Sequence, residues 1–166
     1  MAALITGKVA PDFTLSTTDG KQVHLRDLLQ RGPVVLAFFK ISCPVCQFAF
    51  PLYERLAQAH ANNGATFLGI SQNSARDTKA FAREYGVTFP IAMDDEAHGF
   101  AASSAYGLTN VPTVFYIAPG GEIEVSSVGW SKAEVDEISA KLAARREQKA
   151  PSLWRAGEDV PAFRPG

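Results

Sequence analysis

The sequence lacks an excess of charge of either sign and lacks a long hydrophobic run. Lys and Arg together number 16 against 17 for Asp and Glu, so nothing indicates a polyanionic partner held by counterion release, and no nucleic acid is expected. No apolar stretch approaches the about 18 residues of a membrane-spanning helix, so no membrane span is expected. Internal repeats and low-complexity segments are absent as well. These absences leave a globular protein that acts on other proteins or on small molecules.

The N-terminus also has few basic residues. Lys8 is the only base before Pro11, which is too little for a signal peptide. We therefore expect a cytoplasmic protein, or a periplasmic one if a leader has been removed.

Cysteine is equally scarce, and both cysteines stand together. Cys43 and Cys46 lie in the stretch FFKISCPVCQFAFP, residues 38–51. Such a pair can be a redox dithiol, half of a zinc site or the clamp of a copper carrier. Zinc would need two further ligands, and the three histidines show no ligand spacing (His24, His60 and His98). We therefore expect no metal and no cofactor.

The order of hydrophobic patterns indicates an α/β domain over residues 1–149. Alternation around a Thr-Asp-Gly turn at 18–20 predicts an N-terminal β-hairpin. The apolar run 34–39 predicts a central strand covered on both faces. Strands and helices then alternate, until residues 113–125 predict an antiparallel hairpin before a last helix. The fold expected is a central mixed β-sheet flanked by helices.

The final stretch, residues 150–166, has a different composition. It contains three prolines but also four apolar anchors, namely Leu153, Trp154, Val160 and Phe163. Disordered segments usually lack such anchors. We expect a C-terminal tail that lies extended over the domain with Trp154 at least partly buried.

Cys43 stands where the central strand ends and the next helix begins. A sulfur at a helix N-terminus faces free backbone N–H groups and the positive end of the helix dipole, which favours the thiolate. Pro44 suits the first helical turn, because it needs no N–H there. Cys46 lies one turn further in, so Cys43 is expected to attack and Cys46 to resolve.

These features together resemble the thioredoxin fold. The resemblance covers about residues 7–146 and rests on the Cys43-Pro44-Val45-Cys46 motif, on Pro51 five residues later and on Val111-Pro112-Thr113, which is similar to the family's cis-proline loop. The segments APDFTL and DGKQVHLRDL are similar to the redoxin (AhpC/TSA) branch, and YGLTNVPTVFYIAPGGEI to its oxidoreductases of cytochrome maturation. The resemblance implies a thiol-disulfide oxidoreductase with Pro112, Val111 and Pro44 at its substrate groove.

The departures from the family pattern keep two alternatives open. Ala37 and Ala49 stand where relatives carry buried carboxylates that accept a proton. A peroxiredoxin-like thiol peroxidase with Cys46 as its attacking residue is the first alternative, although Phe39 and Cys43 replace the pocket residues that peroxiredoxins need and Thr113 their arginine. A copper carrier is the second and the weaker one. The partners implied are protein or small-molecule thiols and disulfides, together with a recycling dithiol donor.

Overall fold

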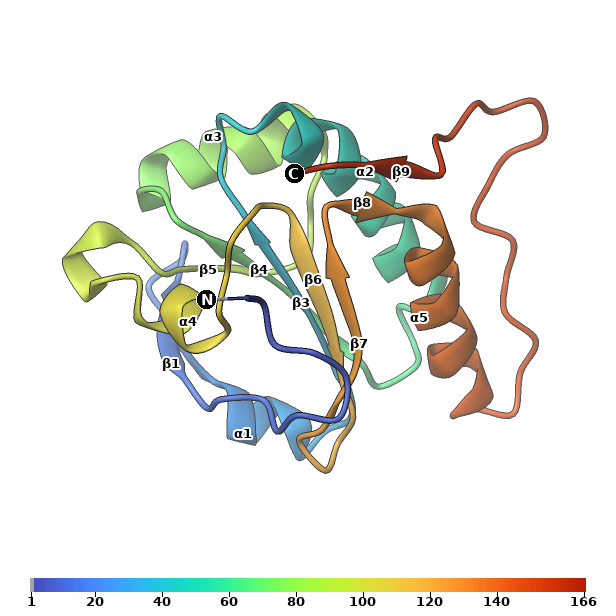
Figure 1. Ribbon diagram of the computed structural model, residues 1–166, viewed down its shortest axis with the longest axis horizontal. Coiled ribbons are helices and arrows are strands. Elements are labelled where there is room, and N and C mark those ends of the chain that lie inside the picture. The colour runs from blue at the N-terminus through green and yellow to red at the C-terminus, as the bar shows by residue number, and fades with distance from the viewer. Residues whose placement is uncertain (1) are drawn as a thin grey trace.

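A seven-stranded mixed sheet forms the centre of the computed structural model, which describes residues 2–166 (Figure 1). The strand order is β2-β1-β5-β4-β3-β6-β7, and β8 and β9 form a separate two-stranded pair. Along the chain the elements are β1 (Thr14–Thr17), β2 (Gln22–His24), α1 (Leu25–Leu29), β3 (Val34–Phe39), α2 (Pro44–Ala59), β4 (Thr66–Ser71), α3 (Ala75–Tyr85), β5 (Ile91–Met93), the short 3-10 helix η1 (Glu96–His98), α4 (Ala101–Ala105), β6 (Thr113–Ile117), β7 (Ile123–Val128), β8 (Trp130–Ser131), α5 (Lys132–Ala144) and β9 (Phe163–Arg164).

The middle of the sheet follows the sequence pattern closely. All six residues of β3 are buried, as the continuous apolar run predicts. β3 pairs in parallel with β4 on one side and antiparallel with β6 on the other. Both predicted hairpins are confirmed, because β1 pairs antiparallel with β2 and β6 antiparallel with β7. The predicted mixed α/β fold is therefore confirmed.

The two faces of the sheet carry separate hydrophobic cores. Side chains of β3 alternate between them, with Val35, Ala37 and Phe39 on the face covered by α2, α3 and α5. The other face is covered by α1 and α4 together with Tyr106. Cys46 belongs to the first core. The side chain at position 37 therefore lies on the same side of the sheet as Cys46.

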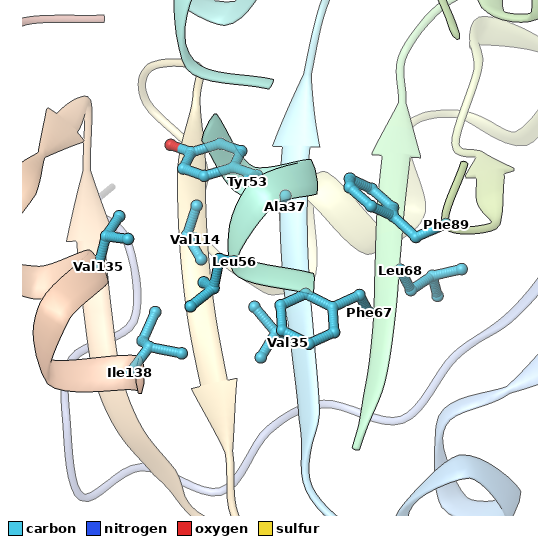
Figure 2. A pocket seen from close by; sticks show the side chains of 10 residues that line it. All are labelled: Val35, Ala37, Tyr53, Leu56, Phe67, Leu68, Phe89, Val114, Val135 and Ile138. Carbon is cyan, nitrogen blue, oxygen red and sulfur yellow. The ribbon is translucent and has the colours of Figure 1, made fainter. Parts of the chain in front are cut away.

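A small apolar cavity remains between the sheet, α2 and α5. Its volume is ≈ 10 Å³, which is enough for about one water molecule. Figure 2 shows Tyr53 and Leu56 of α2 beside Ala37 and Val114 of the sheet. The remaining lining residues are Val35, Phe67, Leu68, Phe89, Val135 and Ile138. Apart from the Tyr53 hydroxyl, none of these side chains carries a polar group.

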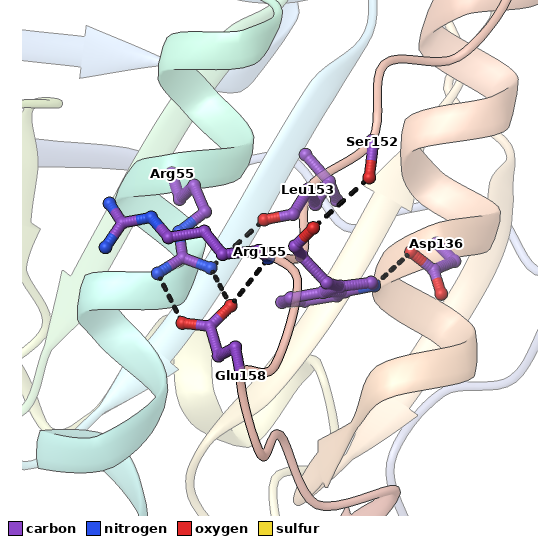
Figure 3. Close-up of polar contacts among 7 residues, drawn as sticks. Arg55, Asp136, Ser152, Leu153, Arg155 and Glu158 are labelled. Atoms are coloured by element: carbon purple, nitrogen blue, oxygen red, sulfur yellow. Dashed lines mark hydrogen bonds and ion pairs between the residues drawn. The ribbon is translucent and has the colours of Figure 1, made fainter.

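The C-terminal tail lies along α2 and α5 (Figure 3). Leu153 is 5% exposed and joins the core on the α2 face. The Arg55 guanidinium donates to the Leu153 carbonyl at 3.0 Å and to both Glu158 carboxylate oxygens, at 2.7 and 2.9 Å. Trp154 is partly buried, and its indole N–H donates to Asp136 at 2.9 Å. The tail thus contacts the domain through apolar, ionic and hydrogen-bonded groups.

The Arg55–Glu158 pair gives the tail contact a dependence on pH. Hydrogen bonding to Arg55 lowers the pKa of Glu158 from 4.5 to about 2. A carboxyl group whose pKa is lower in the folded chain stabilises that chain fully above its unfolded pKa. This stabilisation is therefore lost as the pH falls from about 4.5 through about 2.

We expect Leu153→Ala to lower the free energy of unfolding by about 2 kcal/mol, because it removes a buried side chain and leaves a space beside α2. Chemical denaturation followed by circular dichroism measures this change. Asp159→Ala, at an exposed position of the same tail, is the matched control and should leave stability unchanged. Equal stability of the two variants would show that the Leu153 side chain does not stabilise the fold. The division of the chain at residue 149 remains a prediction.

Among residues 2–166, no helix is both long enough and apolar enough to cross a lipid bilayer.

Candidate active site

The two cysteines meet at the start of α2. Cys43 is the N-cap residue of this helix, and its sulfur accepts the Cys46 backbone N–H at 3.2 Å. Pro44 lies in the first turn of α2. A backbone N–H at this place has no partner within the helix, so its absence in proline costs no hydrogen bond. An N–H group directed at sulfur favours the anionic form of that sulfur. The local sequence therefore places the Cys43 sulfur at the N-terminus of α2, within hydrogen-bonding distance of a backbone N–H.

The loop before β6 lies against Cys43. The Cys43 thiol donates to the Val111 carbonyl oxygen at 3.4 Å. The peptide bond between Val111 and Pro112 is cis, the isomer expected from the sequence. The Thr113 hydroxyl donates to the Asn110 carbonyl at 2.8 Å and ties the loop to the start of β6. Two segments 68 residues apart in sequence thus form one site.

A groove of ≈ 430 Å³ opens beside Cys43. Pro44 and Val111, two of the three residues that the resemblance implied for a substrate groove, line it, whereas Pro112 is buried and is absent from its walls. The full lining is Lys40, Cys43, Pro44, Gln72, Leu108, Thr109, Asn110, Val111 and Gly166. Lys40 is the only charged side chain in this set. Most of the wall is therefore backbone and neutral side chains.

The two thiols are free and differ in exposure. Cys43 is partly exposed, whereas Cys46 is 0% exposed. Burial raises the pKa of the Cys46 thiol well above its usual range, and the hydrogen bond with Cys43 raises it further. Backbone hydrogen bonds at Lys40 and Cys46 oppose this rise only in part. Cys46 is therefore a neutral thiol at ordinary pH until a base removes its proton.

Within residues 2–166, the groups that act on the Cys46 pKa include no carboxylate. Ala37 and Ala49 are both buried, so methyl groups fill the two positions at which the resemblance implied acids. The buried carboxylates lie elsewhere and are occupied: Asp94 accepts the Ala102 and Ser103 N–H groups, and Glu54 accepts from Thr88. Over the described chain, no cluster of three or more His, Cys, Asp or Glu side chains could hold a metal ion.

Several groove residues were not predicted from the sequence. Gln72 follows the end of β4, and its amide donates to Ser103 at 2.9 Å. Lys40, Gln72 and Leu108 also line a neighbouring hollow of ≈ 490 Å³, which is lined further by Phe100. The rule that ligands bind at the carboxyl ends of parallel strands would have indicated Gln72. No sequence pattern indicated that Asn110 and Gly166 line the groove.

Comparison with known proteins agrees with this geometry. The sequence pattern of the AhpC/TSA family matches residues 6–126. The thiol-disulfide oxidoreductase ResA of Halalkalibacterium halodurans is 32% identical over 134 residues, which cover 80% of this chain and 74% of the relative.

Solved structures show the same architecture. A putative protein disulfide isomerase from Bacteroides thetaiotaomicron superposes with a TM-score of 0.76 at 29% identity, covering 86% of this chain and 94% of the other. A secreted disulfide oxidoreductase of Mycobacterium tuberculosis, homologous to DsbE of E. coli, gives 0.65 at 25% identity, covering 80% and 95%. With a family match over most of its length and a thioredoxin-like sheet that carries the dithiol, the chain belongs to the AhpC/TSA family.

Proposed function

We propose that Cys43 and Cys46 carry the thiol-disulfide oxidoreductase activity of this chain, with Cys43 as the attacking residue. The observation that carries the proposal is the unequal exposure of the two sulfurs. Cys43 lines an open groove and accepts an N–H hydrogen bond, whereas Cys46 is fully buried. A substrate disulfide can approach the first sulfur only.

The exchange proceeds in two steps that balance in atoms and electrons. The Cys43 thiolate attacks one sulfur of the substrate disulfide, forms a mixed disulfide and releases the other sulfur as a thiolate, which takes up a proton. Cys46 then loses its proton and attacks the Cys43 sulfur. The Cys43–Cys46 disulfide forms and the second substrate thiol leaves. The substrate gains two electrons, and the dithiol of this chain loses them.

Val111 and Pro44 bind the substrate on either side of Cys43 in this proposal. Both line the groove, and Val111 is half-buried with its carbonyl next to the reactive sulfur. Pro112 acts through the backbone instead, because its ring is buried and it fixes the start of β6. An extended substrate can hydrogen-bond to loop backbone of this kind where no other segment covers it.

Thiols and disulfides, on proteins or on small molecules, are the substrates of this chemistry. Repeated turnover as a reductant needs a dithiol donor that reduces the Cys43–Cys46 disulfide again, so a recycling donor is a required partner. The similarity to a secreted oxidoreductase supports the periplasmic alternative, a location outside the cytoplasm. Redox poise differs between these compartments, and it decides the direction of exchange.

The direction can be measured. We expect Cys43 and Cys46 to form one reversible disulfide when equilibrated with mixtures of reduced and oxidised glutathione, read out by alkylation of free thiols and mass spectrometry. Each ~30 mV of reduction potential changes the equilibrium constant tenfold. A potential near that of reducing cellular pools indicates a reductant, and a markedly higher one an oxidant.

A second measurement separates exchange from peroxide chemistry. The parent should react with a small aromatic disulfide far faster than with hydrogen peroxide, because Cys46 is buried and Thr113 stands where peroxiredoxins place an arginine. Stopped-flow tryptophan fluorescence follows both reactions. Faster reaction with peroxide, retained in Cys43→Ser, would favour the peroxidase alternative with Cys46 as the attacking residue.

A further inference from the structure

The C-terminal segment reaches the groove of Cys43. β9 pairs antiparallel with β8, with Arg164 opposite Trp130 and Phe163 opposite Ser131. Gly129 permits this approach, because a β-carbon there would lie 2.6 Å from the Arg164 carbonyl oxygen. The Lys132 N–H donates to the Ala162 carbonyl at 3.0 Å. The segment is thus held by backbone hydrogen bonds as an added strand.

Gly166 contacts the same carbonyl as the reactive cysteine. A β-carbon on Gly166 would lie 2.3 Å from the Val111 oxygen, so the two backbones are in direct contact. The Asn110 amide donates to the Gly166 carbonyl at 3.3 Å. The Cys43 thiol donates to that same Val111 oxygen at 3.4 Å. Gly166 therefore lies next to the reactive sulfur and forms one wall of its groove.

Arg164 holds the segment in this place. Its guanidinium lies 4.3 Å from the centre of the Phe48 ring, and Phe48 packs edge-on against Trp130 at 5.4 Å. A guanidinium over an aromatic face is attracted by the ring quadrupole. Phe48 belongs to α2, the helix that contains Cys46 and is capped by Cys43. The contact thus couples the segment to the active-site helix.

We propose that residues 162–166 determine substrate class by occupying the path of an extended polypeptide beside Val111. A peptide that pairs with exposed backbone needs the space that Gly166 fills. A small disulfide needs only the open part of the groove between Lys40, Pro44 and Gln72. The segment therefore admits small disulfides and excludes polypeptides until it is displaced. This inference rests on the proposed role of Cys43.

Residues 162–166 are held by few contacts and can be displaced from the groove. β8 and β9 are two residues long each, and such short pairs are weak by themselves. Phe163, Arg164, Pro165 and Gly166 are all exposed. The stronger contacts of the tail lie further back, at Leu153, Arg55 and Glu158 (Figure 3). The end of the tail can leave the groove while the rest stays bound.

The test compares two substrates on three proteins. The substrates are 5,5'-dithiobis(2-nitrobenzoate) and a synthetic unstructured peptide with one disulfide, and the proteins are the parent, Arg164→Ala and a truncation that lacks residues 162–166. If the segment fills the groove in ~90% of molecules, the peptide rate in the parent is lowered by about tenfold. Both variants should therefore raise the second-order rate with the peptide by up to about tenfold, and leave the rate with the small disulfide within about twofold.

Phe163→Ala is the matched control, since this side chain neighbours Arg164 but is 58% exposed. It should behave as the parent. Unchanged or reduced peptide rates in both Arg164→Ala and the truncation would overturn the inference, since the segment then does not obstruct polypeptides. If the Cys43→Ser variant reacts with the small disulfide as fast as the parent does, the proposed role of Cys43 is refuted instead. Thermal unfolding of each variant confirms that the fold is intact.

Discussion

Cys43→Ser is expected to abolish disulfide exchange, whereas Cys46→Ser is expected to stop it halfway. A serine hydroxyl at position 43 is a poor nucleophile at neutral pH, and the remaining sulfur is 0% exposed. Loss of a nucleophile typically lowers turnover by on the order of 10³-fold or more. Reaction with 5,5'-dithiobis(2-nitrobenzoate) releases one coloured thiolate at the first step and a second at resolution. The parent should release two equivalents, Cys46→Ser one, and Cys43→Ser none.

Cys46→Ala separates the loss of sulfur from the introduction of a hydroxyl. It should match Cys46→Ser in stopping at one equivalent, with the adduct found on Cys43 by mass spectrometry. Ser42→Ala, next to Cys43 in the same loop, should release two equivalents as the parent does. The assignment is wrong if Cys43→Ser still releases one equivalent and Cys46→Ser releases none, because the roles are then reversed.

The sequence predicted those parts of the structure that local pattern decides. β3 is a continuous apolar run and β1 and β2 flank a Thr-Asp-Gly turn, so strand burial and the hairpin follow from neighbours in sequence. The start of α2 was equally predictable, since the apolar strand run ends at Phe39 and Pro44 suits a first helical turn. The pairing of Cys43 with Val111 came from family resemblance rather than from pattern, because it joins distant segments.

The groove walls and the path of the tail could not be predicted in the same way. The place of Gly166 depends on Gly129, on the Arg164 contact with Phe48 and on the ion pair between Arg55 and Glu158. Each of these contacts joins residues that are far apart in the chain. Apolar anchors such as Leu153 indicated that the tail contacts the domain, but not which surface it covers. The spacing of apolar residues along the sequence does not predict such contacts between distant segments.

The second large effect is expected in the pH dependence of the resolving step. Burial raises the pKa of Cys46, so its thiolate is a small fraction at neutral pH. Below that pKa, the thiolate fraction grows about tenfold for each pH unit. The second release of coloured thiolate should therefore accelerate by nearly tenfold per unit between pH 6 and about 9. A flat profile over this range would mean that an unrecognised base takes the Cys46 proton.

Ala37→Asp tests whether the missing carboxylate causes this dependence. Position 37 lies on the sheet face covered by α2 and borders the small cavity shown in Figure 2. A carboxylate there lies on the same side of the sheet as Cys46 and can accept the Cys46 proton inside the protein. We expect the resolving step at pH 7 to become faster and its pH profile flatter. Stability should fall, because an acid is buried among apolar side chains.

Ala37→Asn is the matched control for that variant. Its amide has nearly the same size and buries a polar group at the same position, but it cannot act as a base. The first release, which reports attack by Cys43, should be unchanged in both variants. Faster resolution in Ala37→Asp alone assigns the effect to proton transfer. If Ala37→Asn accelerates resolution equally, the cause is polarity or loosened packing around α2, and the absent carboxylate does not limit the reaction.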